Sequence, residues 1–171
     1  MNENDFLIVV TPFKDKIFRI AKRLLVSVEE AEDATQEVLL KLWNHRQKIT
    51  TYTSPEAFAM TMTKNWCFDR LKSKQAQNLK IVHNNYEDHS QALQKSIEVN
   101  DSLRWVEKYM EALPKKQKLI VQLRDIEQLE FNEIAKILDM TETTIRVSLS
   151  RARKTIREKL TKTHDYGIKS H

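Results

Sequence analysis

The sequence predicts an all-α protein made of two small helical domains that are joined by a polar, flexible linker. The chain has one Gly and three Pro in 171 residues, which disfavours hairpin-rich β folds because tight turns consume Gly. Apolar residues recur with a helical period in two separate stretches. Between these stretches, 14 of the 28 residues from 73 to 100 are Asn, Gln, Ser, His or Asp, so a packed core is not expected to continue through them.

The composition also narrows the class of protein. The scarcity of Gly argues against glycine-rich phosphate-binding loops. The single cysteine, Cys67, excludes an internal disulfide and a multi-Cys zinc site, and it suits a reducing compartment. The 29 Lys and Arg residues against 24 Asp and Glu give a net charge of +5, which permits a nucleic-acid partner without establishing one.

No segment is expected to cross a membrane. The longest run of aliphatic and aromatic residues, 6–10, has five residues, whereas a spanning helix needs about 20. The run is also shorter than the core of a secretory signal, about 7–15 residues, and it follows Glu3 and Asp5 instead of Lys or Arg. We therefore expect a cytoplasmic protein.

Three helices are expected in the first 74 residues. The first should begin at Thr11 and Pro12, a pair typical of an N-cap and a first helical residue. The second is expected over 28–44, and the third opens at Ser54 and runs to about residue 74. The third helix carries apolar residues on both sides, which predicts a central place between the other two. The apolar positions that define the three helices are Phe13, Ile17, Ile20, Leu24, Ala31, Ala34, Val38, Leu42, Phe58, Met60, Met62, Cys67 and Leu71.

The organisation of the chain follows from these patterns. We expect one domain over residues 1–75, a linker over 76–101, a second domain over 102–161 and a polar, frayed tail over 162–171. In the second domain, helices are expected from residue 103, from Pro114 to about residue 126, over 131–138 and over 143–160.

The last two of these helices have the pattern of a helix-turn-helix. Small Ala135 lets the second helix cross closely, and Ile134, Leu138 and Ile145 fill the space between the helices. The turn needs a residue that tolerates positive φ, and Asp139 does so better than most. Thr141 can cap the second helix.

That second helix separates an apolar stripe from a basic face. Residues 144–160 contain six basic side chains and one acidic one, Glu158. At 100° per residue, Ile145, Leu149 and Ala152 share the stripe with Ile156 and Leu160. The basic side chains on the opposite face suit a major groove, where Arg contacts guanine edges and other cations contact phosphates. The polar residues on this face, which we expect to contact DNA, are Thr143, Arg146, Ser150, Arg153, Lys154 and Arg157.

Two surfaces of the first domain are also candidates for binding. On the helix over 28–44, acidic and amide side chains surround Leu40 and Trp43, which indicates either a basic protein partner or, equally, a core Trp with solvated acids. The end of the third helix interleaves cations with Asn65, Trp66 and Phe68. These side chains can stack on single-stranded bases, although at least one aromatic ring is expected in the core.

Together these residues resemble the sigma-70 family of bacterial transcription initiation factors, in its extracytoplasmic-function (ECF) type. Residues 31–43 are similar to the family's AEDxxQExFLxLW stretch. Residues 58–71 are similar to its WLxxIARNxxxDxL stretch, and Leu113–Pro114 with 133–153 to its LP…EIAxxLG…GTVxSRxxRAR stretch. Asp139 stands where the family has the Gly of the turn. The resemblance implies a region 2 domain, which binds the polymerase clamp and recognises and melts the −10 element, and a region 4 domain, which recognises the −35 element.

The resemblance also implies a role for individual residues. The residues that would dock on the β′ clamp helices of core RNA polymerase are Asp33, Gln36, Glu37, Leu40 and Trp43. The residues that would hold the −10 strand, partly in the loop 48–53, are Lys48, Thr50, Thr51, Tyr52, Lys64, Asn65, Arg70, Lys72 and Lys74. The helix-turn-helix would read the −35 element with Thr143, Thr144, Arg146, Ser150 and Arg153, while its apolar flank would dock on the β flap.

The implied function is promoter-specific initiation, without chemistry of the chain's own. One copy would act per polymerase, with promoter DNA and an anti-sigma factor as partners, and with no cofactor, metal or small-molecule substrate. Two alternatives remain: an ordinary helix-turn-helix regulator that dimerises on duplex DNA, and a helical adaptor that binds only protein. An enzyme is disfavoured, because His83 and His89 in the linker lack a carboxylate–Cys set at ligand spacing.

Overall fold

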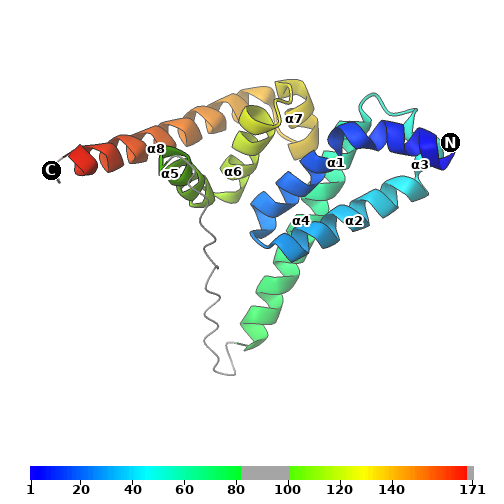
Figure 1. Cartoon of the computed structure of the whole chain (residues 1–171), viewed down its shortest axis with the longest axis horizontal. Helices are drawn as coiled ribbons and strands as arrows, with labels where there is room; N and C mark the ends of the chain where they lie inside the picture. Colours follow the sequence, from blue (N-terminus) through cyan, green and yellow to red (C-terminus); the bar gives the residue numbers. More distant parts are fainter. Residues whose placement is uncertain (82–100, 169–171) are drawn as a thin grey trace.

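The computed structural model describes residues 1–81 and 101–168, and the regular secondary structure of these residues is entirely helical, with no strand among them. An N-terminal unit contains α1 (Glu3–Leu25), α2 (Val28–Asn44), α3 (Arg46–Ile49) and α4 (Pro55–Ile81). A C-terminal unit contains α5 (Asp101–Glu111), α6 (Lys115–Val121), the π-helical turn η1 (Gln122–Ile126), α7 (Phe131–Leu138) and α8 (Glu142–Ile168). The predicted all-α architecture with two small helical units is confirmed (Figure 1). Residues 82–100 and 169–171, which include most of the expected linker with His83 and His89, lie outside the described residues.

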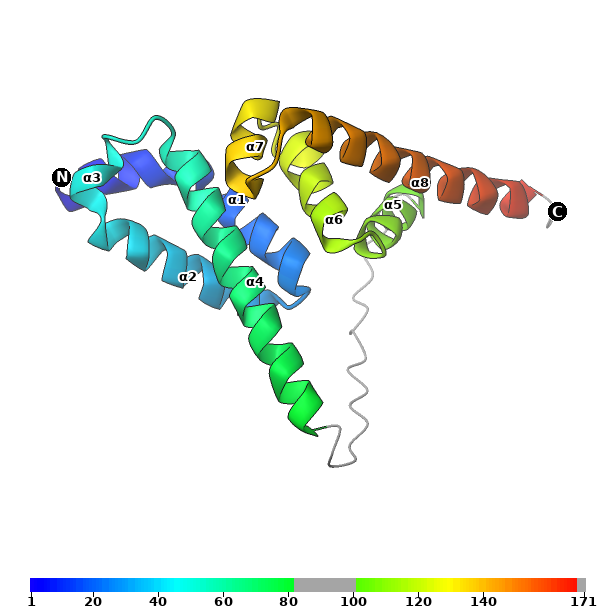
Figure 2. The same cartoon turned by 180° about the vertical axis from the view of Figure 1, so that it is seen from behind.

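The N-terminal unit is a bundle in which α1, α2 and α4 contact one another. The expected stripes are buried: Ile17, Ile20 and Leu42 are at most 1% exposed. Figure 2 shows α4 crossing in front of α1 and α2. The helix that packs most extensively against both others is α1, so the central place expected for the third helix is wrong. Burial of these side chains stabilises the bundle by about 1.5–3 kcal/mol for each large apolar residue.

The start of α1 differs from the sequence-based expectation. The helix begins at Glu3, and Asn2 caps it: Asn2 Oδ1 accepts from the Asp5 N–H at 2.8 Å, and Asp5 Oδ2 accepts from the Asn2 N–H at 3.3 Å. Pro12 lies inside the helix. Pro12 has no N–H to donate to the carbonyl of Ile8, four residues earlier, and Ile8 lies on the exposed side of the helix, with 73% of its surface accessible.

The expected cap of the third helix is confirmed, but its end is not. The Ala57 N–H donates to Ser54 Oγ at 3.1 Å, directly before Pro55. The helix continues to Ile81, seven residues beyond the expected end. The added residues have no apolar period to reveal a helix, although Lys, Gln, Ala and Leu favour helical backbone.

The turn of the helix-turn-helix forms as its residues predict. Asp139 has φ 52° and ψ 52°, in the left-handed region. Thr141 Oγ1 accepts from the Thr144 N–H at 3.2 Å and thereby caps α8. Ile134 and Ile145 are fully buried between the two helices.

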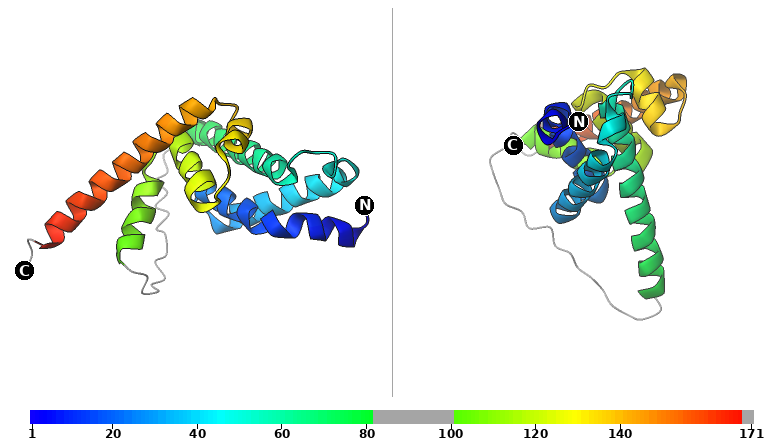
Figure 3. Two further views of the ribbon diagram at one scale, coloured as in Figure 1. Left: turned by 90° about the horizontal axis from the view of Figure 1, so that it is seen from above. Right: turned by 90° about the vertical axis from the view of Figure 1, so that its right-hand side faces the viewer.

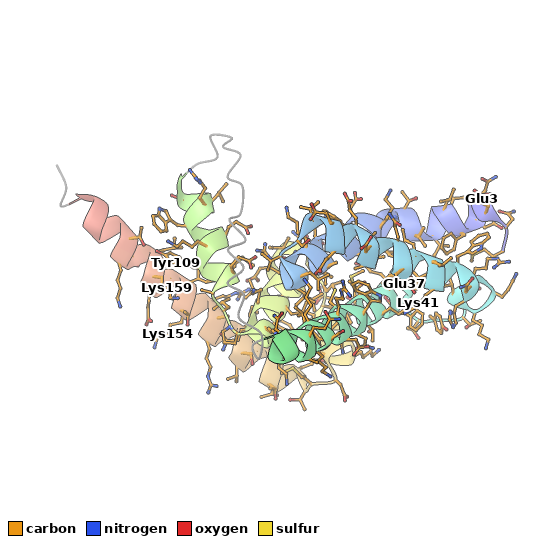
Figure 4. The ribbon with its side chains drawn as sticks, turned by 90° about the horizontal axis from the view of Figure 1, so that it is seen from below. Glu3, Glu37, Lys41, Tyr109, Lys154 and Lys159 are labelled. Atoms are coloured by element: carbon orange, nitrogen blue, oxygen red, sulfur yellow. The ribbon has the colours of Figure 1, made fainter. Side chains whose placement is uncertain are left out.

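The C-terminal end of α8 corrects the expectation of a frayed tail from residue 162. The helix extends to Ile168 and is supported by α5. Tyr109 of α5 bonds through its hydroxyl to Thr163, and Lys159 lies over the Tyr109 ring at 5.7 Å. Figure 4 shows Tyr109 and Lys159 side by side at the point where the two helices meet.

The two units are in contact through α1 with α6 and η1, and through α4 with α7 (Figure 3). Hydrogen bonds also join α1 to α5 and η1. Arg23 of α1 donates to Glu107 at 2.7 Å, to Glu111 at 2.8 Å and to Gln122 at 2.9 Å. The sequence pattern does not predict this contact.

Among the helices of the described residues, none is long and apolar enough to span a membrane.

Candidate nucleic-acid interface and partner surface

The exposed face of α8 carries the residues expected to contact duplex DNA. Ile145, Leu149 and Ala152 are buried against the rest of the C-terminal unit, so the opposite face points to solvent. The polar residues on or beside that face are all exposed: Thr143, Thr144, Arg146, Ser150, Arg153, Lys154 and Arg157. The helix therefore presents one continuous basic surface that could enter a groove.

Two cations of this surface are held by other elements. Arg153 makes a two-point contact with Asp125 of η1, in which Arg153 Nε donates to Asp125 Oδ2 at 3.1 Å. This hydrogen bond raises the pKa of Arg153. The Arg146 guanidinium lies 3.8 Å from the ring centre of Phe131, the first residue of α7. Asp125 and Phe131 were not singled out from the sequence, because only the folded chain brings them to α8.

The loop expected to hold the −10 strand follows α2. It includes the short helix α3, in which Ile49 is fully buried. Thr51 Oγ1 donates to the Lys48 carbonyl at 2.6 Å. The Tyr52 ring lies 4.4 Å from the Phe58 ring of α4. Lys48, Thr50 and Thr51 are exposed at this end of the unit.

A hollow of about 390 Å³ lies beside α4. It combines an aromatic wall, an amide, a carboxylate and cations, which is a set of groups that could bind a base and its phosphate. Asn65 is exposed at its rim, while Trp66 is half-buried against the core. The residues that line the hollow are Lys41, Met62, Asn65, Trp66, Asp69 and Arg70.

Other expected −10 residues are engaged within the protein. Lys74 and Arg70 both pair with Glu30 of α2, the latter at 3.8 Å, whereas Lys72 is exposed. Lys64 Nζ donates to the carbonyl of Ile137 in α7 at 2.8 Å. Burial lowers the pKa of Lys64, and the charge of Asp139 opposes this effect.

The acidic face of α2 is open to solvent. Asp33 and Gln36 are exposed, Leu40 is 54% exposed, and Glu37 is half-buried. Figure 4 shows Glu37 and Lys41 together on this helix, and their charged atoms lie 3.8 Å apart.

Trp43 lies at the edge of the acidic face. Its ring packs edge-on against Phe6 at 5.1 Å, and Arg46 lies over it at 4.2 Å. The residue is therefore half core and half surface, which combines the two interpretations that the sequence left open.

Nothing in the described residues points to a metal centre: within 1–81 and 101–168, no three His, Cys, Asp or Glu side chains are placed together to hold an ion. Cys67 is fully buried, and desolvation raises its pKa to about 12, with a smaller contribution from Glu30. A thiol with such a pKa is poorly suited to nucleophilic or metal-binding roles.

Comparison with known proteins agrees with this arrangement. Residues 9–77 match the family model "Sigma-70 region 2", and residues 103–156 match "Sigma-70, region 4". The first match falls on the N-terminal unit and the second on the helix-turn-helix unit.

Related proteins show the same organisation. The chain is 22% identical to the ECF RNA polymerase sigma factor SigW of Bacillus subtilis (strain 168) over 169 residues, which cover 93% of this chain and 90% of SigW. Among solved structures, the fold is similar to the sigma factor RpoE, solved with the anti-sigma factor NepR from Bartonella quintana, with a TM-score of 0.76, 19% identity and coverage of 92% and 97%. It is also similar to CnrH, solved with the cytosolic domain of CnrY, with a TM-score of 0.64, 15% identity and coverage of 94% and 90%.

Region 2 matches the N-terminal helical unit and region 4 matches the C-terminal one, so the chain contains both regions in order. The similarity to SigW covers nearly the whole length of both chains. The chain thus belongs to the sigma-70 family of RNA polymerase sigma factors, in its ECF group.

Proposed function

We propose that the chain binds core RNA polymerase and directs it to promoters, with the N-terminal unit on the −10 element and the helix-turn-helix on the −35 element. The observation that carries this proposal is the basic face of α8, whose polar side chains are exposed while Ile145, Leu149 and Ala152 of the apolar face are buried. Bond formation belongs to the polymerase, and the chain contributes binding alone. Linking two weak DNA-binding units raises their joint occupancy through effective concentration.

Different surfaces of the chain would bind the polymerase and the DNA. The acidic face of α2 suits a basic surface of the polymerase, which the family places at the β′ clamp helices. The apolar flank of the helix-turn-helix would dock on the β flap. The hollow beside Asn65 and the loop 48–53 would hold unstacked bases of the melted strand, whose phosphates attract the nearby cations.

We also propose control by an anti-sigma factor, acting on a chain that works in the cytoplasm as one copy per polymerase. The similar sigma factor RpoE was solved with the anti-sigma factor NepR, and the similar CnrH was solved with the cytosolic domain of CnrY. Such a partner would cover the surfaces that otherwise bind polymerase.

Run-off transcription tests the proposed function. Core bacterial polymerase is given genomic fragments from the source organism, with the chain present or absent. New discrete start sites that need the chain support the proposal, and their upstream sequences define the two promoter elements. Duplex binding in the absence of polymerase, with no new start sites, favours an ordinary helix-turn-helix regulator instead.

A matched pair of variants separates the polymerase surface from the rest of the chain. Asp33→Ala with Gln36→Ala removes side chains from the exposed acidic face, whereas Glu3→Ala with Asn4→Ala removes a similar pair from exposed positions at the start of α1. We expect the first pair to lower co-elution with core polymerase and the second to leave it unchanged. Intact co-elution of the first pair would remove the clamp assignment.

A further inference from the structure

Phe131 joins the beginnings of the two helices of the helix-turn-helix. It is the first residue of α7 and is half-buried. The guanidinium carbon of Arg146, in the second turn of α8, lies 3.8 Å from its ring centre, and that of Arg124, in η1, lies 4.5 Å from it. One aromatic ring therefore contacts two guanidinium groups that come from different elements.

Contacts other than the one with the Phe131 ring also hold Arg124 in place. Its Nη1 donates to the Leu129 carbonyl at 2.8 Å, and Glu130 lies 3.5 Å from the same nitrogen. Arg124 is also less exposed than Arg146, with 28% against 56% of the side chain accessible. Arg124 thus helps to hold the ring in place.

Arg146 has a looser set of partners apart from the ring. Glu142, one turn earlier on α8, lies 3.5 Å away, and both side chains are about half exposed. An exposed i, i+4 ion pair of this kind contributes little to the positioning of a side chain. The stacking contact with Phe131 is therefore the main restraint on the direction of Arg146.

The guanidinium carbon of Arg146 lies over the Phe131 ring at stacking distance, and of its N–H groups only Nη2 pairs with Glu142, in an exposed contact that DNA can replace. A guanidinium stacks on an aromatic ring through its flat face, while its N–H donors lie in its plane and point outward. Guanine presents N7 and O6 in the major groove, and an Arg edge can donate to both at once. A side chain already restrained by stacking loses less conformational freedom when it binds.

We propose that Phe131 is a positioning residue that presets Arg146 to recognise a base pair of the −35 element, with a G·C pair as the best match. The proposal rests on the proposed function, since it assigns a base contact to one residue of the same DNA-binding face. Arg146 contacts the base, and Phe131 acts only through Arg146.

The test compares base preferences of the holoenzyme. Promoter fragments from the mapped start sites, with the −35 region randomised, are transcribed by core polymerase with the wild-type chain, Arg146→Ala, Phe131→Leu, Phe131→Tyr and the Phe131→Leu/Arg146→Ala double variant. We expect Arg146→Ala to lose preference at one or two adjacent positions. Phe131→Leu should weaken the same preference about tenfold, which corresponds to about 1.4 kcal/mol. Phe131→Tyr, which keeps the ring, should retain it.

The double variant distinguishes positioning from a separate role. If the ring acts through Arg146, Phe131→Leu adds no further loss of preference in the Arg146→Ala background. A Phe131→Leu effect at other base positions, or an equal effect on all sequences, would overturn the proposal. So would an Arg146→Ala variant that keeps every base preference, although promoter-specific transcription would then leave the proposed function intact.

A spectroscopic measurement keeps the proposal testable if Phe131→Leu is unstable. The ring should shift the Arg146 Nε–H proton resonance of the full chain upfield, and Phe131→Tyr should preserve that shift. An Arg146 Nε–H at the usual arginine position in the wild-type chain would show that the stacking is absent in solution and would overturn the proposal. If the wild-type chain produces no new start sites, both the proposed function and this inference are overturned.

Discussion

Arg19 of α1 holds the buried carboxylate of Glu127, a residue of the other helical unit: Arg19 Nε and Nη2 donate to Glu127 Oε1 and Oε2 at 2.9 and 2.7 Å. The Glu127 side chain is 0% exposed, and within its own unit Gln122 donates to it at 2.9 Å. This two-point hydrogen bond raises the pKa of Arg19. The C-terminal unit thus contains a buried charge whose guanidinium partner belongs to the N-terminal unit.

Removing Arg19 should loosen the contact between the units. Arg19→Ala leaves the Glu127 carboxylate without its cation, and we expect a loss of about 1–3 kcal/mol in the free energy of unfolding, because Arg19 itself is half exposed. Urea unfolding measures this loss, and small-angle scattering should show a larger radius of gyration. Lys14→Ala, a change at an exposed position of the same helix, is the control. Equal values for both variants would contradict the expectation.

The contact should also weaken in acid. The hydrogen bond from Arg23 lowers the pKa of Glu107 below its ordinary value of 4.5, against an opposing effect of burial. A carboxylate whose pKa is lower in the folded chain than in the unfolded chain stabilises the folded state. This contribution is complete above the ordinary pKa and is lost as the pH falls through the lowered pKa. We expect the radius of gyration to rise below pH 4.5.

The pH effect should be modest, because the Glu107 side chain is 60% exposed and solvent screens the pair. Glu107→Gln removes the titrating group, so its pH profile should be flatter than that of the wild-type chain in this range. Glu3→Gln, at an exposed site on α1, should leave the profile unchanged. Profiles that coincide for wild type and Glu107→Gln would assign the acid response to other carboxylates.

Val26 offers a position at which the chain can be stabilised. It closes α1 with φ 63°, its N–H donates to the Lys22 carbonyl at 2.9 Å, and it is 68% exposed. The left-handed region is costly for a β-branched residue and free for Gly. Val26→Gly should therefore raise the free energy of unfolding by about 1 kcal/mol. Val28→Gly, inside the first turn of α2, should lower it by about 0.5–1 kcal/mol, and chemical denaturation compares the two.

Cys67 should be unreactive in the folded chain. It is fully buried, and its pKa is raised to about 12, so almost no thiolate forms at pH 8. A thiol reagent such as DTNB should react only as the chain unfolds. Ser73→Cys in a Cys67→Ala background places a thiol at an exposed position of the same helix and should react at once. Rapid labelling of Cys67 without denaturant would show that α4 opens locally.

The elements with a complete apolar stripe were predictable from the sequence, and helix 28–44 has the predicted bounds. The start of α1 was not, because Pro12 follows Thr11 and together they imitate a helix start, whereas the true cap is formed by Asn2 and Asp5. The ends of α4 and α8 were also missed, since their polar residues carry no period.

The site was predictable where a helical wheel suffices. The exposed face of α8 follows from the buried stripe that contains Ile145 and Leu149. The partners of that face were not predictable, because Asp125 lies 28 positions before Arg153. The contact between Arg19 and Glu127 spans 108 positions, and a charged residue on an amphipathic helix gives no sign of a distant partner.

The hydrogen bond from Lys64 to the Ile137 carbonyl couples the two units to the −10 strand, if Lys64 contacts that strand as the family resemblance implies. The ammonium has three donors, so it competes between α7 and the strand only where the phosphate lies away from the Ile137 carbonyl. In that case strand binding and the docked arrangement oppose each other through this one group. By reciprocity, whatever separates α7 from α4 strengthens strand binding by the same free energy with which the strand favours separation. A polymerase that holds the two units apart would therefore also prepare Lys64 for DNA.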